Sequence, residues 1–128
     1  LKLAIQEALK NPIKPRGRNS ISRFAAVLSD GKQTFIGLNS YKSHPLQARY
    51  GKEDYSGPIH AELGVLIRAI RSRAKEAGVH YSDITDFKGY RMAVARVLKD
   101  GSPANARPCR ACSEALRAFN ITEVEWTI

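Results

Sequence analysis

Residues 60–62 read His-Ala-Glu and residues 108–112 read Pro-Cys-Arg-Ala-Cys, and both stretches open predicted helices. Behind the first, apolar residues recur at spacings of three and four up to Gly78, a pattern typical of a helix closed by a glycine. Behind the second, an apolar stripe of the same period stops at Asn120. The two stretches therefore bring one histidine, two cysteines and one carboxylate to the N-termini of two helices.

Short apolar runs around these helices predict four strands. The runs from Phe24 to Leu28 and from Thr34 to Leu38 are joined by a tight Asp-Gly turn, which predicts a β-hairpin. Apolar and polar residues alternate from Tyr90 to Leu98, where residues 99–103 end the segment. The same alternation returns from Glu123 to Ile128 and predicts the last strand.

The order of these elements is that of an α/β protein. An amphipathic helix over residues 1–10 precedes the hairpin, and the later strands are separated by helices. A helical crossover makes the two strands that it joins parallel, so we expect the third and fourth strands to lie parallel in a mixed sheet covered by helices. The chain has 128 residues, 43% of them apolar, which suits one domain over residues 1–128.

The histidine and the two cysteines predict a metal site. A catalytic zinc takes three protein ligands and leaves a fourth position for water, and His60, Cys109 and Cys112 supply three. Cys109 and Cys112 share one helix face, and the positive end of the helix dipole favours their thiolates. We therefore expect one Zn2+ per chain as the cofactor.

Glu62 is the predicted acid and base of this site. It follows the histidine by two residues, so it can approach the open zinc position without filling it. Each feature alone has an ordinary explanation, because a histidine can sit in a core and a first-turn carboxylate can satisfy the helix dipole. A structural zinc site would need a fourth ligand, and His44 lies beside a proline while His80 lies past a helix end. The combination favours a catalytic site.

His-x-Glu followed by Pro-Cys-x-x-Cys is the signature of zinc-dependent nucleobase deaminases. On these residues the chain resembles the cytidine/deoxycytidylate deaminase superfamily, and its short final segment is similar to that of compact phage-type members. The resemblance covers residues 23–39, the His60 helix, residues 90–98 and residues 108–126. It implies a three-layer α/β/α fold and hydrolysis of cytosine to uracil and ammonia. Members usually continue into a further helix and a fifth strand, so we expect either a sheet that lacks this strand or a chain that continues beyond Ile128.

The resemblance also implies substrate contacts for three residues. In the family, an asparagine that closes the second strand contacts the nucleoside, and Asn39 matches it. The backbone amide at the position of Ala61 holds the base carbonyl, and the carbonyl at the position of Arg107 lies near the departing amine.

Two substrate classes stay open. A free cytidine or deoxycytidine nucleotide or nucleoside is the first expectation, and single-stranded DNA or RNA, as in AID/APOBEC-type enzymes, is the second. The net charge of +9, the basic loop around Arg16, Arg18 and Arg23, and tyrosines such as Tyr55 favour the second, because cations and aromatic rings together hold single strands. The tyrosines would equally suit a lid packed on itself or an interface in a homo-oligomer.

Two further classes share the motif. An adenine-directed tRNA enzyme uses the same ligands, and an inactive zinc-stabilised nucleic-acid-binding module would keep them but has no use for Glu62.

The chain has no run of eighteen apolar residues and no signal-peptide pattern, and its closely spaced cysteines suit a metal better than a disulfide. We therefore expect a cytoplasmic protein with no membrane partner.

Overall fold

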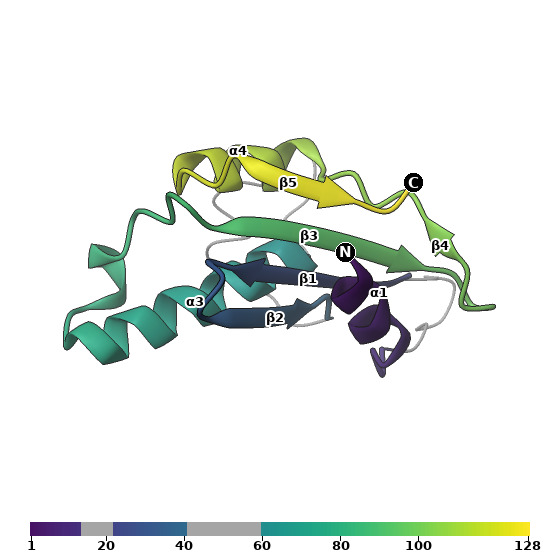
Figure 1. Ribbon diagram of the computed structural model, residues 1–128, viewed down its shortest axis with the longest axis horizontal. Coiled ribbons are helices and arrows are strands. Elements are labelled where there is room, and N and C mark those ends of the chain that lie inside the picture. Colours follow the sequence, from purple (N-terminus) through teal and green to yellow (C-terminus); the bar gives the residue numbers. More distant parts are fainter. Residues whose placement is uncertain (14–21, 41–59) are drawn as a thin grey trace.

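The computed structural model describes residues 1–13, 22–40 and 60–128 (Figure 1). Its elements, in chain order, are α1 (Lys2–Leu9), β1 (Arg23–Ser29), β2 (Thr34–Leu38), α3 (Ala61–Ala77), the 3-10 turn η1 (Tyr81–Asp83), β3 (Arg91–Val97), β4 (Pro103–Ala104), α4 (Arg110–Ala118) and β5 (Glu123–Trp126). Every helix and strand expected from the sequence is present, with ends shifted by one or two residues.

The strands form one mixed sheet. Its order is β2-β1-β3-β4, and β5 also pairs with β3. The hairpin β1-β2 is antiparallel, and β3 runs antiparallel to β1 from Arg23 opposite Val97 to Ser29 opposite Arg91. β5 runs parallel to β3, so the predicted parallel pairing of the third and last expected strands is confirmed.

The expectation of four strands is wrong by one short strand. Residues 99–103 were expected only to end β3, but the chain reverses there and returns as β4, which pairs antiparallel with Arg96 and Val97. Gly101 turns the chain with a φ of 87°, and the Leu98 amide closes the turn on the Ser102 carbonyl. This turn leads the backbone along β3 before it enters α4. The sheet therefore has five strands, and the additional one, β4, lies before α4 in the chain.

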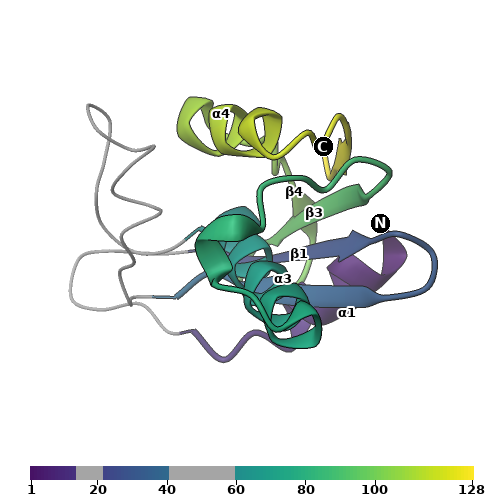
Figure 2. The same cartoon turned by 90° about the vertical axis from the view of Figure 1, so that its left-hand side faces the viewer.

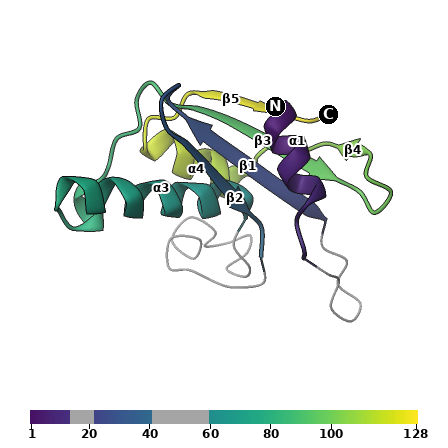
Figure 3. The same cartoon turned by 60° about the horizontal axis from the view of Figure 1, so that its bottom comes forward.

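Helices cover both faces of the sheet, which confirms the three-layer α/β/α fold (Figure 3). Alternate residues of each strand face opposite layers. In β1, Ala26 and Leu28 belong to the core under α3 and α4, whereas Ala25 and Val27 belong to the core under α1. Figure 2 shows the same arrangement from the side, with α4 and α1 on opposite sides of the strands.

A glycine in β2 sets the position of α3. A Cβ atom at Gly37 would lie 2.6 Å from the Cα atom of Val65, so only glycine lets the helix backbone come this close. Further contacts pair Arg68 with the Ile36 carbonyl and Gln33 with Glu76. The helix therefore runs antiparallel to β2 and begins over the end of that strand.

Candidate metal centre

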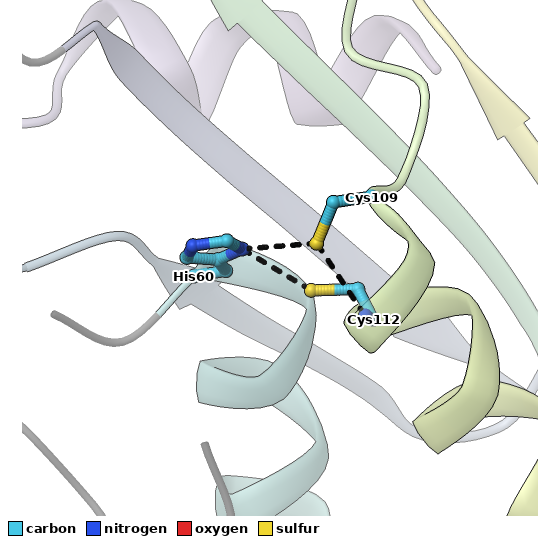
Figure 4. A group of neighbouring side chains, drawn as sticks. All are labelled: His60, Cys109 and Cys112. Atoms are coloured by element: carbon cyan, nitrogen blue, oxygen red, sulfur yellow. Dashed lines mark hydrogen bonds between the residues drawn. The ribbon is translucent and has the colours of Figure 1, made fainter. Parts of the chain in front are cut away.

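The three predicted metal ligands meet between the N-termini of α3 and α4 (Figure 4). His60 is the N-cap residue of α3 and Cys109 is the N-cap residue of α4. The His60 Nδ1 atom lies 3.6 Å from the Cys109 Sγ atom and 3.3 Å from the Cys112 Sγ atom. All three ligand atoms lie within 4.8 Å of one another.

This spacing fits a tetrahedral zinc ion. Zn–S bonds of about 2.3 Å and Zn–N bonds of about 2.0–2.1 Å at a tetrahedral angle put nitrogen and sulfur about 3.6 Å apart. Cys112 is buried whereas Cys109 is exposed, so solvent reaches the site on the side of Cys109. Within residues 1–13, 22–40 and 60–128, no other group of three His, Cys, Asp or Glu side chains is arranged to hold a metal.

The two thiols differ in their affinity for a proton. The pKa of Cys109 is lowered to about 4, because the Cys112 thiol and His60 hydrogen-bond to its sulfur and the Cys112 amide donates to it as well. The pKa of Cys112 is raised, because its thiol donates to Cys109 and because it is buried. The neighbouring Cys109 raises the pKa of His60. Without a metal, the cysteine pair therefore holds one proton, on Cys112.

The segment ahead of α4 is fixed to the sheet through Thr127. The Thr127 amide donates to the Val94 carbonyl, and the Thr127 carbonyl accepts from the Ala106 amide at 2.9 Å. Its buried hydroxyl donates to the Ala104 carbonyl and accepts from the Arg96 amide. These bonds fix the backbone at Ala106, three residues before Cys109, and so set the position at which α4 begins.

Glu62 lies in the first turn of α3 and is 4% exposed. Burial raises the pKa of its carboxyl, and the Cys112 thiol hydrogen-bonds to it. A buried carboxyl that contacts a ligand cysteine and holds its proton more tightly than usual suits proton transfer near neutral pH.

Ala61 and Arg107 lie beside the ligands. Ala61 is buried between His60 and Glu62, at a helix position whose N–H has no intrahelical acceptor. Arg107 is exposed two residues before Cys109, and its amide donates to the Asn105 side chain at 2.9 Å.

Asn39, at the end of β2, links three segments of the chain through side-chain hydrogen bonds. Its Oδ1 atom accepts from the Phe24 amide at 3.0 Å and from the Asn11 side chain at 2.8 Å. Its Nδ2 atom donates to the Ser22 carbonyl. With 6% exposure and bonds on both polar atoms, the side chain already joins β1, β2 and the segment after α1.

Arg23 is not brought to the metal centre. It stands in β1 two residues before Ala25, whose side chain faces α1. Its guanidinium donates to the Leu9 and Leu98 carbonyls, each at 2.9 Å. The alternation of side chains along the strand thus sends Arg23 to the face opposite the ligands. Arg16, Arg18, Tyr55 and His44 lie outside the described residues.

Sequence reasoning missed Arg96, a half-buried cation on the metal side of β3. The available signal was its even spacing from Met92 and Val94, whose side chains belong to the same core as Cys112.

No protein-family model and no curated protein matches this sequence. None of the helices in the described part of the chain is long and apolar enough to cross a membrane.

Proposed function

We propose that the protein is a zinc-dependent deaminase that hydrolyses the C4 amine of a cytosine base in a free cytidine or deoxycytidine nucleotide or nucleoside. One observation carries the proposal: His60, Cys109 and Cys112 gather within 4.8 Å, and the buried Glu62 carboxyl contacts this set. A structural zinc site has no use for a buried, proton-holding carboxyl, whereas hydrolysis needs one. Two thiolate ligands also suit a reducing compartment such as the cytoplasm.

The residues around the ligands divide the chemistry between them. A zinc ion held by the three ligands would lower the pKa of a bound water toward 7. Glu62 accepts a proton as the water oxygen bonds to C4 and delivers it to ring N3. Glu62 then moves the proton of the new C4 hydroxyl to the exocyclic amine, the C4–N bond breaks as the C4 carbonyl forms, and ammonia leaves. In the proposed reaction, the Ala61 amide, whose N–H has no intrahelical acceptor, would hold the O2 carbonyl of the base.

Mass spectrometry of parallel reactions tests this proposal. Zinc-loaded protein is incubated with dCMP, deoxycytidine, a cytosine-bearing oligonucleotide and tRNA, and the products are examined for uracil and inosine. We expect uracil from dCMP or deoxycytidine, and no product with Glu62→Gln at the same zinc content. Inosine alone would assign the site to adenine, and no product from any substrate would contradict the proposal.

A polynucleotide substrate is the second candidate, and the charge of the chain favours it. The chain carries a net charge of +9, and Lys14, Arg16 and Arg18 lie close together in the sequence. A single strand bound through several phosphates loses affinity steeply with salt, with a log-log slope of roughly −0.7 per contact. Activity on the oligonucleotide that falls along such a slope, and flattens in the double variant Arg16→Ala/Arg18→Ala, would establish this candidate. Salt-independent activity on dCMP would exclude it.

A further inference from the structure

Asn39, Phe24 and Arg96 form a row across the neighbouring strands β2, β1 and β3. Phe24 in β1 stands opposite Arg96 in β3, and on its other side its amide binds the Asn39 side chain at the end of β2. Phe24 packs against the core that contains Cys112, whereas the neighbouring residues of both strands face α1. Arg96 therefore projects to the same side of the sheet as the metal ligands.

The row lies at the end of the sheet where both ligand helices begin. α3 runs antiparallel to β2 and starts over its last residues, near Asn39. On the other side, Thr127 accepts from the Arg96 amide and binds the Ala106 amide, three residues before Cys109. Arg96 thus occupies the strand between the histidine helix and the cysteine helix.

Two contacts hold the Arg96 guanidinium in place, and no carboxylate in the described part of the chain pairs with it. Its Nε atom donates to the Ser22 hydroxyl at 3.0 Å, and its Cζ atom lies 5.7 Å from the centre of the Phe24 ring. Among the described residues it forms no ion pair. Arg91, at the far end of the same strand, is 80% exposed and pairs with Glu123 at 2.7 Å. Within residues 1–13, 22–40 and 60–128, the exposed arginine of β3 thus has a carboxylate partner and the half-buried one has none.

A half-buried cation with no carboxylate partner suits an anionic ligand. Removing a charge from water is costly unless another charge compensates for it. The guanidinium fork matches a phosphate group, because it can donate two parallel hydrogen bonds. Nε is already bonded to Ser22, so the two terminal nitrogens can serve this purpose.

We infer that Arg96 binds the phosphate of the substrate and that the enzyme therefore acts on phosphorylated cytosine compounds in preference to the nucleoside. The inference rests on the proposed function and deepens it, because it names the group that the site recognises besides the base. The phosphate can belong to a mononucleotide or to a polynucleotide, and the substrates of the test separate these sources.

Arg96→Gln is the main variant, because glutamine removes the charge but can still reach Ser22. We expect kcat/KM on dCMP to fall roughly 10- to 100-fold, as for a lost charge-assisted hydrogen bond, mainly through KM. The kcat/KM on deoxycytidine, which has no phosphate, should change less than about threefold. Arg96→Lys should recover part of the loss. The matched control, Arg91→Gln, removes a charge from the same strand and should change neither substrate.

The outcomes are separable. A loss confined to dCMP and the cytosine-bearing oligonucleotide supports the inference, and the larger of the two losses identifies the source of the phosphate. Equal losses on dCMP and deoxycytidine, or no loss on either phosphorylated substrate, would overturn it.

If the wild type deaminates nothing, the proposed function fails, and calorimetry with dCMP and deoxycytidine tests Arg96 separately. Tighter binding of dCMP by the wild type but not by Arg96→Gln supports the inference, and equal binding of both by the wild type overturns it.

Discussion

The two faces of the sheet use the same strands for different purposes. The core under α1 is built of small apolar side chains, with Ala4, Ala8, Ala25, Val27, Ala93, Ala95 and Val97. The core under α3 and α4 contains larger side chains, such as Phe87 and Met92, and also Cys112 and the neighbouring carboxyl of Glu62. Glu62 is the only buried carboxylate in the described part of the chain. The core under α1 is thus formed by apolar side chains, whereas the core under α3 and α4 also contains an ionisable carboxyl, whose burial is costly and is typical of functional sites.

Removing a ligand should have the largest effect. Cys112→Ala deletes a buried thiol that a zinc ion requires, so we expect the zinc content to fall from one per chain to a small fraction and activity to fall to background. Elemental analysis and a deamination assay measure the two quantities, and circular dichroism checks the fold. Full zinc and full activity in this variant would remove Cys112 from the site.

Glu62→Gln should separate chemistry from metal binding. We expect about one zinc per chain and a loss of turnover on the order of 10²–10⁴-fold, because the proton carrier is gone. Near-normal turnover would show that another group moves the protons.

The same substitution should stabilise the metal-free protein at high pH. The folded state raises the pKa of Glu62, so it binds this proton more tightly than the unfolded chain does. Stability from this group is therefore present at low pH and is lost as the pH rises above the usual range of a glutamate. Glutamine has no proton to lose, so the melting temperature of Glu62→Gln should exceed that of the wild type increasingly with pH. A constant difference would contradict this account.

Overpacking the core under α1 should lower the stability of the protein and leave zinc binding and turnover unchanged. Ala95 is fully buried among small residues, and Ala95→Leu overpacks them at a cost of roughly 1–3 kcal/mol. We expect a lower melting temperature with unchanged zinc content and unchanged kcat for the folded protein. Val94 is the neighbouring residue on the metal face, in one core with Cys112, so Val94→Phe should lower both the melting temperature and the zinc content. Loss of zinc in Ala95→Leu would show that the two faces are not independent.

The smallest predicted effect is the pH dependence of zinc binding. Cys112 keeps its proton in the metal-free protein and must release it, so the apparent association constant should rise about tenfold per pH unit through neutrality. At pH values below the raised pKa of His60, a second proton is released and the rise becomes steeper. Calorimetry in two buffers of different ionisation enthalpy counts these protons. An affinity that is independent of pH would contradict the assigned protonation states.

The elements that the sequence predicted correctly have strong local patterns. The helices and long strands follow from apolar periods within single segments, and the ligands follow from residue types at short spacings. β4 could not be predicted in this way, because Pro103 and Ala104 read as part of a turn. Their pairing depends on the turn at Gly101 and on the distant Thr127 hydroxyl.

The surroundings of Arg23 and Arg96 could not be predicted from the sequence, because they depend on the register of the strands. A shift of one position moves a strand residue to the other face, so Arg23 and Phe24 differ completely in their surroundings. The same alternation takes Arg96 to the metal side, which its charge alone does not indicate. The bonds of Asn39 depend on Asn11, which lies 28 residues earlier and has no local signal.

The ligands of the metal centre also join distant parts of the chain. His60 is separated by 49 residues from Cys109 and by 52 from Cys112, and a zinc ion would tie α3 to α4 across that span. An ion that binds the folded chain alone adds RT ln(1 + [Zn]/Kd) to its stability, or about 2.7 kcal/mol at a free concentration of 100 Kd. The melting temperature of the protein then rises with the free zinc concentration of its surroundings. Zinc depletion would thus remove the catalyst and shorten the lifetime of the chain in a cell that degrades unfolded proteins.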